Sequence, residues 1–416
     1  MSPSRHFVHT ARVGHWLPAH PIHLHKWLRK TLESVEREKR PFHPVVEEYR
    51  ALIENDPVIN MYFTQMFEQQ PLFPPPPGSG DVKLTDYRQM LEVLNHILGT
   101  APEFNATGMV GTPINAILDF PMMTRAGLAA FLDPRVNAML KKVLKAWAVF
   151  LDSPDSCYVL NTSATGWLSP EALREIHMDD FIHDSGAPYF GFRSWNDFFI
   201  RKFRPGMRPV VDRGNDNVIV SACESAPFAI STSVNRSESF WIKSQPYSLT
   251  HLLAGLFVDE FVGGTVYQAF LSAKNYHRWH SPVSGTIRKI HHIEGTYFAE
   301  AASEHFDPVG PNNSQGYIAH TATRSLIFIE GPAPIGLTCV IAIGMAEVSS
   351  CIVTVTENST VKKGDQLGYF QFGGSTHCLV FRKGVISQFA AQAIPQGLNG
   401  EHSDIVKVNS LLAVAY

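Results

Sequence analysis

Apolar residues in the first half of the chain recur three and four positions apart, which is the spacing of one face of an α-helix. This pattern predicts helices over Pro44–Asn55, over Pro57–Gln69, from Tyr87 to Leu98 and from Pro134 to Leu151. Asp56 is a typical N-cap for the second of these, with Pro57 in its first turn. We interpret the apolar stripes, including the one that carries Trp147, as core-facing.

Two stretches depart from this pattern. Met1 to Thr31 contains no Asp or Glu, and its prolines and scattered leucines make a poor amphipathic helix, so residues 1–40 are expected to be extended. An acid-free start is also typical of a mitochondrial presequence, which leaves targeting as an alternative. Farther on, residues 71–80 are rich in Pro and Gly and are expected to form a surface loop or linker.

Short runs of β-branched and aromatic residues, punctuated by Gly, Pro and Asn, replace the helical pattern after residue 210. They predict strands over residues 217–220, 265–271, 286–290, 325–329, 338–343 and 350–355. We therefore predict an α+β fold. An extended segment (1–40) and a helical domain (41–190) precede a β-rich barrel or sandwich domain (191–416).

Composition indicates which kinds of partner and location the sequence disfavours. The formal charge is −3, from 35 basic and 38 acidic residues, which does not favour nucleic acid. The five cysteines lack the spacing of a zinc or redox motif, so we expect reduced thiols. No secretory signal is visible, and the longest charge-free apolar stretch, 331–346, is too short and too rich in Pro and Gly to span a membrane. We expect a cytoplasmic protein with no integral membrane segment.

Candidate chemistry begins at Gly-Gly-Ser-Thr, residues 373–376. The glycines lack Cβ atoms, so the backbone can bend until the Ser375 hydroxyl approaches the Gly374 carbonyl, as an N→O acyl shift requires. Segments 281–287 and 361–368 have the strand–Gly–strand character of lipoyl- and biotinyl-type sandwiches. They predict a strand that runs into an exposed, sharply turned tip. Taken alone, Gly-Gly-Ser-Thr is also an ordinary turn.

Two further segments carry ionisable side chains. His277 and His280 lie three residues apart beside a predicted strand, and such a pair can shuttle protons near neutral pH. A metal site is the rival interpretation, but no third ligand has suitable spacing nearby, so no metal is expected. Glu224 ends an apolar strand, where a carboxylate can orient a histidine. A surface histidine pair and a solvated turn acid remain the plainer alternatives.

Taken in order, the three segments resemble the phosphatidylserine decarboxylase family, over residues 190–416. That family has a Tyr-His-Arg-x-His motif, here at 276–280. It also has an Arg-Pro-containing stretch after a Phe-Phe pair, here at 197–209, and a Gly-Ser-Thr self-cleavage site, here at 374–376.

One departure from the family pattern is Ala-Cys-Glu-Ser at 222–225, where members usually have Pro-Ala-Asp-Gly. This change, the helical N-terminal extension and Trp279 are similar to a fungal subgroup of the psilocybin-pathway type. Members of that subgroup decarboxylate free aromatic L-amino acids, notably L-tryptophan.

The resemblance implies that the enzyme processes itself. Glu224 and His280 are expected to draw the proton from Ser375, whose hydroxyl attacks Gly374. The chain then breaks between residues 374 and 375, and residue 375 becomes a pyruvoyl group. The large chain (1–374) is expected to stay paired with the small chain (375–416).

The reaction that the resemblance implies is decarboxylation of a small amino acid, L-tryptophan to tryptamine and CO2. The pyruvoyl group takes the role of pyridoxal phosphate, which is not expected, and His277 is the candidate acid that protonates the substrate Cα. The first alternative is a phosphatidylserine decarboxylase that makes phosphatidylethanolamine, although no anchor or basic amphipathic helix is apparent. The second is an inactive relative that serves as a binding module, against which the intact Ser375, His277 and His280 argue.

Overall fold

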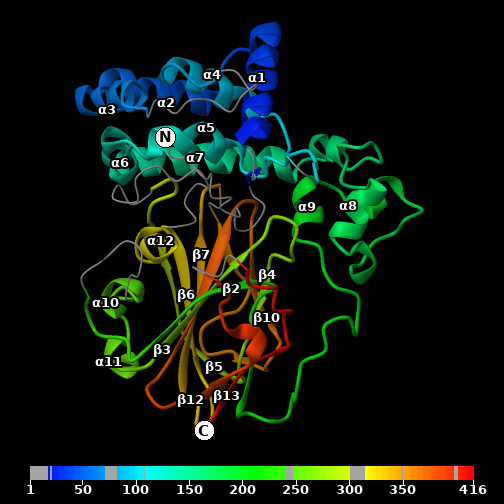
Figure 1. Cartoon of the computed structure of the whole chain (residues 1–416), viewed down its shortest axis with the longest axis vertical. Helices are drawn as coiled ribbons and strands as arrows, with labels where there is room; N and C mark the ends of the chain where they lie inside the picture. Colours follow the sequence, from blue (N-terminus) through cyan, green and yellow to red (C-terminus); the bar gives the residue numbers. More distant parts are fainter. Residues whose placement is uncertain are drawn as a thin grey trace, which may run out of the picture.

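The computed structural model describes residues 17–18, 21–70, 82–106, 108–238, 247–299, 314–347, 350–397 and 402–416. Helices α1 to α7 gather at one end of the long strands, and the C-terminus lies at the opposite end (Figure 1). The predicted α+β fold is confirmed, with a helical N-terminal part and a β-rich C-terminal part. The loop or linker predicted at 71–80 lies outside the described residues.

Helices dominate the described chain up to residue 199. Their bounds are α1 (Pro21–Glu38), α2 (Pro44–Asn55), α3 (Pro57–Glu68), α4 (Tyr87–Ile97), α5 (Pro113–Met122), α6 (Arg125–Leu132), α7 (Pro134–Asp152), α8 (Pro170–Glu175) and α9 (Trp195–Phe199). The predicted helices are confirmed as α2, α3, α4 and α7. Asp56 caps α3 as expected, because its Oδ1 accepts hydrogen bonds from the N–H groups of Val58 and Ile59, both at 3.0 Å.

The extended conformation expected for residues 1–40 is wrong over Pro21–Glu38, which form α1. Leu24, Leu28 and Thr31 are buried at helical spacing along this segment. α1 packs against α4, and such tertiary contact stabilises a helix whose apolar face is narrow.

The β-rich part is built on an open antiparallel sheet with the strand order β2-β3-β11-β7-β6-β5-β9. Its bounds are β2 (Ala226–Thr232), β3 (Thr265–Leu271), β11 (Ser375–Phe381), β7 (Leu337–Gly344), β6 (Arg324–Glu330), β5 (Gly285–Ile293) and β9 (Thr360–Val361). Because β2 and β9 are free edges, this sheet is not a closed barrel.

Two smaller sheets and three short helices cover the large sheet. The small sheets have the orders β4-β10-β8 and β1-β13-β12. Their bounds are β4 (Arg278–His280), β10 (Gln366–Phe370), β8 (Cys351–Val353), β1 (Val218–Val220), β13 (Leu411–Ala415) and β12 (Ile386–Phe389). The opposite face carries α10 (Leu249–Leu252), α11 (Val258–Phe261) and α12 (Gln315–Thr321). All the predicted strands are present, although the one expected over 350–355 is shorter.

Strand β11 lies between β3 and β7, and all its residues are buried. Leu379 and Phe381 face the core shared with the small sheets, whereas Cys378 and Val380 face the core under α10–α12. Since alternate residues of a strand share a face, Ser375 points toward the layer that contains β10.

Two further expectations concern the thiols and the membrane. The cysteines are free and buried, at positions 157, 223, 339, 351 and 378. The apolar stretch 331–346 forms β7 with its preceding turn. Within the described ranges, no helix has both the length and the apolar character needed to cross a membrane.

Candidate active site

The Gly-Gly-Ser turn lies between the end of β10 and the start of β11. Gly373 has a φ of +131°, a backbone conformation that residues with a Cβ rarely adopt. Ser375 is 2 % exposed, and its Oγ has no hydrogen-bond partner among the described residues. The Gly374 carbonyl accepts a hydrogen bond from the N–H of Met345 at 2.9 Å. The turn therefore presents a buried hydroxyl beside a polarised carbonyl.

The predicted sharp turn is confirmed, but its expected exposure is wrong. Gly373 and Gly374 are buried, as is Phe372 just before them. Phe372 packs against Trp147 of α7 and Trp195 of α9, so the helical part covers the tip. Periodicity within each segment does not reveal such a contact between distant segments.

His277 lies beside this turn, in the loop between β3 and β4. Its carbonyl accepts a hydrogen bond from the N–H of Phe370, at the end of β10, at 3.0 Å. Its fully buried ring stacks on Phe199, with ring centroids 3.9 Å apart. Burial, followed by the nearby charge of Arg201, lowers the pKa of His277 to about 3. The imidazole is therefore neutral near pH 7.

His280 occupies a different place. It pairs with Gln366, at the end of β10 that lies away from the turn. Its Nδ1 lies 2.8 Å from the Gly364 carbonyl oxygen, and its Nε2 lies 2.8 Å from the Tyr276 hydroxyl. Because a carbonyl only accepts, Nδ1 carries the hydrogen and Nε2 accepts from Tyr276. Both ring nitrogens are thus already engaged, and burial lowers the pKa of His280.

Glu224 does not hydrogen-bond His280, which corrects the pairing expected from the sequence. Its Oε1 instead accepts hydrogen bonds from Arg208 Nε at 2.6 Å and from the N–H of Val408 at 3.2 Å. Arg208 also contacts the Asp180 carboxylate at 3.0 Å. A charged guanidinium is a stronger partner for a carboxylate than a neutral imidazole that already has two partners.

The Arg-Pro-containing stretch at 197–209 supports the histidine loop. Arg201 donates hydrogen bonds to the carbonyls of Lys274 and Asn275, at 2.7 and 3.2 Å. Burial lowers the pKa of Arg201 to about 10, so the group remains charged at neutral pH. Together with the Phe199 ring, this arginine fixes the position of His277. No cluster of three or more His, Cys, Asp or Glu side chains suited to a metal ion occurs within the described ranges.

Three aromatic side chains surround Phe372, and we call them the aromatic slot: Trp147, Trp195 and Phe199. Their ring centroids lie 5.2, 5.6 and 4.9 Å from that of Phe372, at interplanar angles of 85°, 65° and 64°. Edge-on contacts of this kind are favourable for aromatic rings. Phe199 belongs to the slot on one side and stacks on His277 on the other. The slot therefore adjoins the histidine at the turn.

Glu347 is a buried carboxylate beside the slot, with 2 % of its surface exposed. Its Oε1 accepts hydrogen bonds from the N–H groups of Ile114 and Asn115, at 2.6 and 2.9 Å, in the first turn of α5. Its Oε2 has no partner among the described residues. Burial raises the pKa of Glu347 to about 8. A cavity of about 10 Å³ is lined by this side chain and by Trp147, Phe372 and others.

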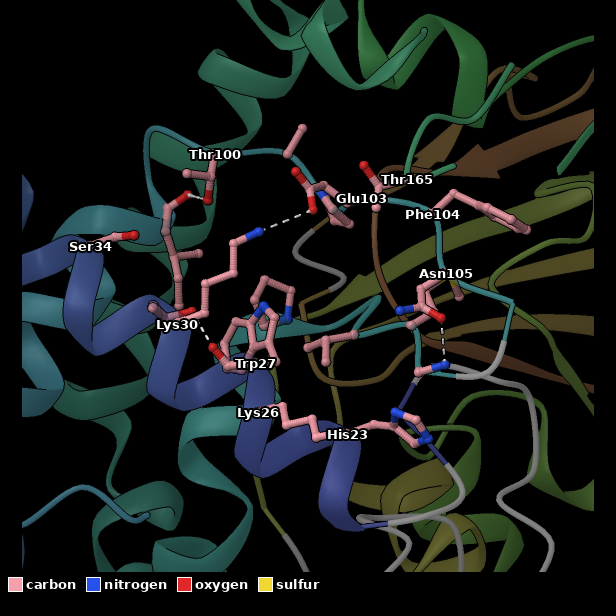
Figure 2. A pocket seen from close by; sticks show the side chains of 18 of the residues that line it. His23, Lys26, Trp27, Lys30, Ser34, Thr100, Glu103, Phe104, Asn105 and Thr165 are labelled. Atoms are coloured by element: carbon pink, nitrogen blue, oxygen red, sulfur yellow. Dashed lines mark hydrogen bonds and ion pairs between the residues drawn. The ribbon is translucent and has the colours of Figure 1, made fainter. Parts of the chain in front are cut away.

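A larger pocket of about 350 Å³ lies between α1, α4 and residues 100–113 (Figure 2). Lys30 extends across it toward the Glu103 carboxylate, 3.7 Å away (Figure 2). Its lining includes neither of the site histidines nor the Gly-Gly-Ser turn. Pro113 lines this pocket, while the next residue, Ile114, donates to Glu347. The start of α5 thus separates the pocket from the smaller cavity.

Comparison with known proteins identifies the relatives of this chain. Two family models match the chain, both described as phosphatidylserine decarboxylase, over residues 43–176 and 195–399. An L-tryptophan decarboxylase of Psilocybe cubensis is 36% identical over 394 residues, covering 88% of this chain and 85% of that protein. The chain belongs to the phosphatidylserine decarboxylase family.

Two further relatives show how the similarity is distributed. Decarboxylase iboD of Amanita muscaria (strain Koide BX008) is 38% identical over 326 residues, covering 73% of this chain and 91% of that protein. Phosphatidylserine decarboxylase proenzyme 3 of Schizosaccharomyces pombe is 33% identical over 228 residues, covering 53% of this chain and 22% of that protein.

Phosphatidylserine decarboxylase family members are pyruvoyl-dependent carboxy-lyases, and this member is a carboxy-lyase. The residues present fit a pyruvoyl group at position 375. Ser375 Oγ is buried without a partner, as expected of a hydroxyl kept for reaction rather than for a structural hydrogen bond. Gly373 gives the turn a conformation that brings the Gly374 carbonyl within reach of Met345.

Sequence reasoning missed the aromatic slot and Glu347. The spacing of Trp147 on α7 matched an ordinary core stripe, and nothing local distinguished it. Glu347 did carry a signal, since it is the acid that directly follows the long apolar stretch 331–346. A carboxylate in that position is costly to bury unless it has partners, which it finds in the N-terminus of α5.

Proposed function

We propose that this enzyme cleaves itself between Gly374 and Ser375 and then decarboxylates free aromatic L-amino acids, with L-tryptophan as the principal substrate. The observation that carries the proposal is the unpartnered Ser375 hydroxyl beside the Gly374 carbonyl that Met345 polarises. The substrate class is supported by L-tryptophan decarboxylases of two Psilocybe species, at 36% and 34% identity, each covering 88% of this chain.

Self-cleavage balances as follows. Ser375 Oγ attacks the Gly374 carbonyl carbon, and the bond from that carbon to the residue 375 nitrogen breaks, giving an ester and a free amine. The Met345 N–H stabilises the negative charge on the carbonyl oxygen during attack. Loss of the residue 375 Cα proton expels the Gly374 carboxylate and leaves dehydroalanine. Water then replaces the amine, ammonia departs and a ketone remains.

His277 is our candidate for the base that accepts the Ser375 proton. The sequence suggested His280 and Glu224 for this step, but His280 already bonds Gly364 and Tyr276. The lowered pKa of His277 keeps its ring neutral at pH 7, and its backbone is tied to the end of β10. We retain it as the candidate acid that delivers a proton to the substrate Cα; it takes up this proton anew in each turnover, because the Ser375 proton passes to the departing residue 375 nitrogen.

A pyruvoyl group at position 375 would supply an electron sink for the pair left when CO2 departs. The protein excludes water around the reacting atoms, since Ser375 is 2 % and His277 0 % exposed. Arg201 holds the loop that bears His277, and Phe199 fixes the ring orientation.

The two products of cleavage, 1–374 and 375–416, are proposed to stay together. β11 becomes the first strand of the small chain, and it pairs along its whole length with β3 on one side and β7 on the other. β13 adds a further pairing with β1 of the large chain. No new contact is needed to hold the chains after the peptide bond breaks.

A substrate panel tests the proposed activity. The purified enzyme, without added pyridoxal phosphate, detergent or lipid, is incubated with L-tryptophan, L-phenylalanine, L-tyrosine and L-serine, and separately with phosphatidylserine vesicles. We expect tryptamine at the highest rate and none from Ser375→Ala. Phosphatidylethanolamine formation without tryptamine would instead establish the phospholipid enzyme.

A further inference from the structure

We propose that Trp147, Trp195 and Phe199 bind the aromatic side chain of the substrate, with Asn196 accepting the indole N–H, and that Phe372 fills this slot until cleavage. The inference deepens the proposed function and rests on it for the identity of the substrate. In the uncleaved chain, the Phe372 ring occupies the site that the substrate ring takes after cleavage.

The ring contacts provide the first argument. Phe372 meets all three slot residues within 5.6 Å between centroids, and only 7 % of its own surface is exposed. The slot walls come from α7 and α9, whereas Phe372 comes from the turn that is cleaved two residues later. An aromatic site is therefore built by one part of the fold and filled by a segment whose covalent attachment changes during maturation.

The sequence of covalent bonds around residue 375 provides the second argument. An amino acid that condenses with a ketone at position 375 places its nitrogen where the peptide nitrogen of Ser375 was. Its Cα then takes the place of the Gly374 carbonyl carbon. The side chain thus starts from the same end of β11 as the segment that leads back to Phe372. Cleavage makes Gly374 a chain end, so Phe372 is no longer anchored on both sides and can leave the slot.

The polar atoms at the edge of the slot provide the third argument. Glu347 Oε2 and Asn196 Oδ1 are both buried and lack a partner among the described residues. Both side chains line the small cavity that Trp147 and Phe372 also line. A phenyl ring offers these oxygens no hydrogen-bond donor, whereas an indole offers its N–H. We choose Asn196 as the acceptor, because its amide oxygen only accepts and its Nδ2 already donates to the Asp152 carboxylate at 2.6 Å, whereas the raised pKa of Glu347 keeps a proton on Oε2 at neutral pH.

Indole binding to uncleaved protein tests the slot without any decarboxylation. Ser375→Ala should remain uncleaved and keep Phe372 in the slot, so added indole should not change its Tm. Ser375→Ala combined with Phe372→Ala should open a cavity, as removal of a buried ring does. At an indole concentration tenfold above Kd we expect its Tm to rise by about 2 °C. Equal indole affinity in the two proteins would overturn the proposal.

A second measurement covers the case in which the double variant fails to fold. Cleaved wild-type enzyme should bind indole in calorimetry, since Phe372 is released. Trp147→Leu should weaken that binding at least tenfold. Phe131→Leu is the matched control, because it removes another fully buried ring, one that packs against Phe63 and Phe298 instead. If both variants bind indole like the wild type, the slot is not where indole binds.

The acceptor is tested with a matched pair of ligands. Indene has the shape of indole but no N–H group. Asn196→Leu should lower the affinity of the cleaved enzyme for indole about tenfold relative to that for indene, as loss of one hydrogen bond predicts. A merely structural role of Asn196 would lower both affinities together and would contradict the assignment.

These results separate the slot from the proposed function. Indole binding that depends on Trp147 and Phe372, in an enzyme that yields no tryptamine, would keep the slot and reject the proposed reaction. Tryptamine formation by an enzyme whose indole binding does not depend on Trp147 or Phe372 would keep the proposed reaction and reject the slot.

Discussion

At the scale of single residues, burial in the fold changes the protonation of His277. Burial and then Arg201 lower its pKa to about 3, so above that pH the ring is neutral. We expect the rate of self-cleavage to stay constant as the pH falls from about 8 to about 5, because an ordinary histidine, with a pKa of about 6.5, protonates only in that range. Gel densitometry of newly made protein measures this, and a tenfold loss per pH unit below 6.5 would contradict it.

The two histidines should behave differently when substituted. His277→Ala should slow cleavage by roughly 10²–10⁴-fold, the usual contribution of a general base. His280→Ala should act less strongly, through the lost hydrogen bonds to Gly364 and Tyr276, and should mainly lower the Tm. Tyr276→Phe is the control, since it removes one of those bonds and leaves both imidazoles. Normal cleavage in His277→Ala with none in His280→Ala would restore the assignment made from sequence.

The carboxylate of Glu224 gives a separate prediction. It accepts from Arg208 at 2.6 Å and caps the Val408 N–H, and both side chains of the ion pair are 11% exposed. Glu224→Gln should lower the free energy of unfolding by about 3 kcal/mol, because it leaves a nearly buried guanidinium less well paired. Glu224→Asp should cost less, since it keeps the charge. Chemical denaturation measures both, with Asp180→Asn as the control for the other partner of Arg208.

At the scale of elements, the conformation of the turn between β10 and β11 depends more on Gly373 than on Gly374. Gly373 has a φ of +131°, whereas a Cβ added at Gly374 would meet Met345 at 3.4 Å, an ordinary contact distance. Gly373→Ala should therefore destabilise the uncleaved protein by about 1–3 kcal/mol and slow cleavage. Gly374→Ala should be tolerated better. Equal effects of the two substitutions, in denaturation and cleavage assays on the same preparations, would show that the turn conformation is not what cleavage requires.

Most helices and strands could be predicted from the sequence, because residues close together in the chain specify them. The N-cap at Asp56 and the stripe along α7 depend on residues within a few positions of one another. α1 escaped prediction because its buried stripe is narrow and its stability comes from packing against α4. The Gly-Gly-Ser turn was predicted as a sharp bend, but its burial depends on helices more than 170 residues earlier in the sequence.

At the scale of the whole molecule, the site is assembled between the helical and β-rich parts. Trp147 reaches Phe372, and Glu347 caps α5 at Ile114, a hydrogen bond between residues 233 positions apart. Such contacts leave no trace in hydrophobic periodicity, which is why the histidines and Ser375 could be found as motifs and the slot could not. The contact predicted between Glu224 and His280 is absent for the same reason, because Arg208, from a different segment, binds the Glu224 carboxylate instead.

Intact mass spectrometry of the purified protein tests the central claim most directly. We predict two chains, 1–374 and 375–416, with the small chain lighter by one ammonia than a peptide that begins with serine, and lacking a free N-terminal amine. Ser375→Ala should give a single chain of full length. A wild-type protein that stays intact, or a small chain that begins with an ordinary serine, would contradict the claim that Ser375 becomes the pyruvoyl group.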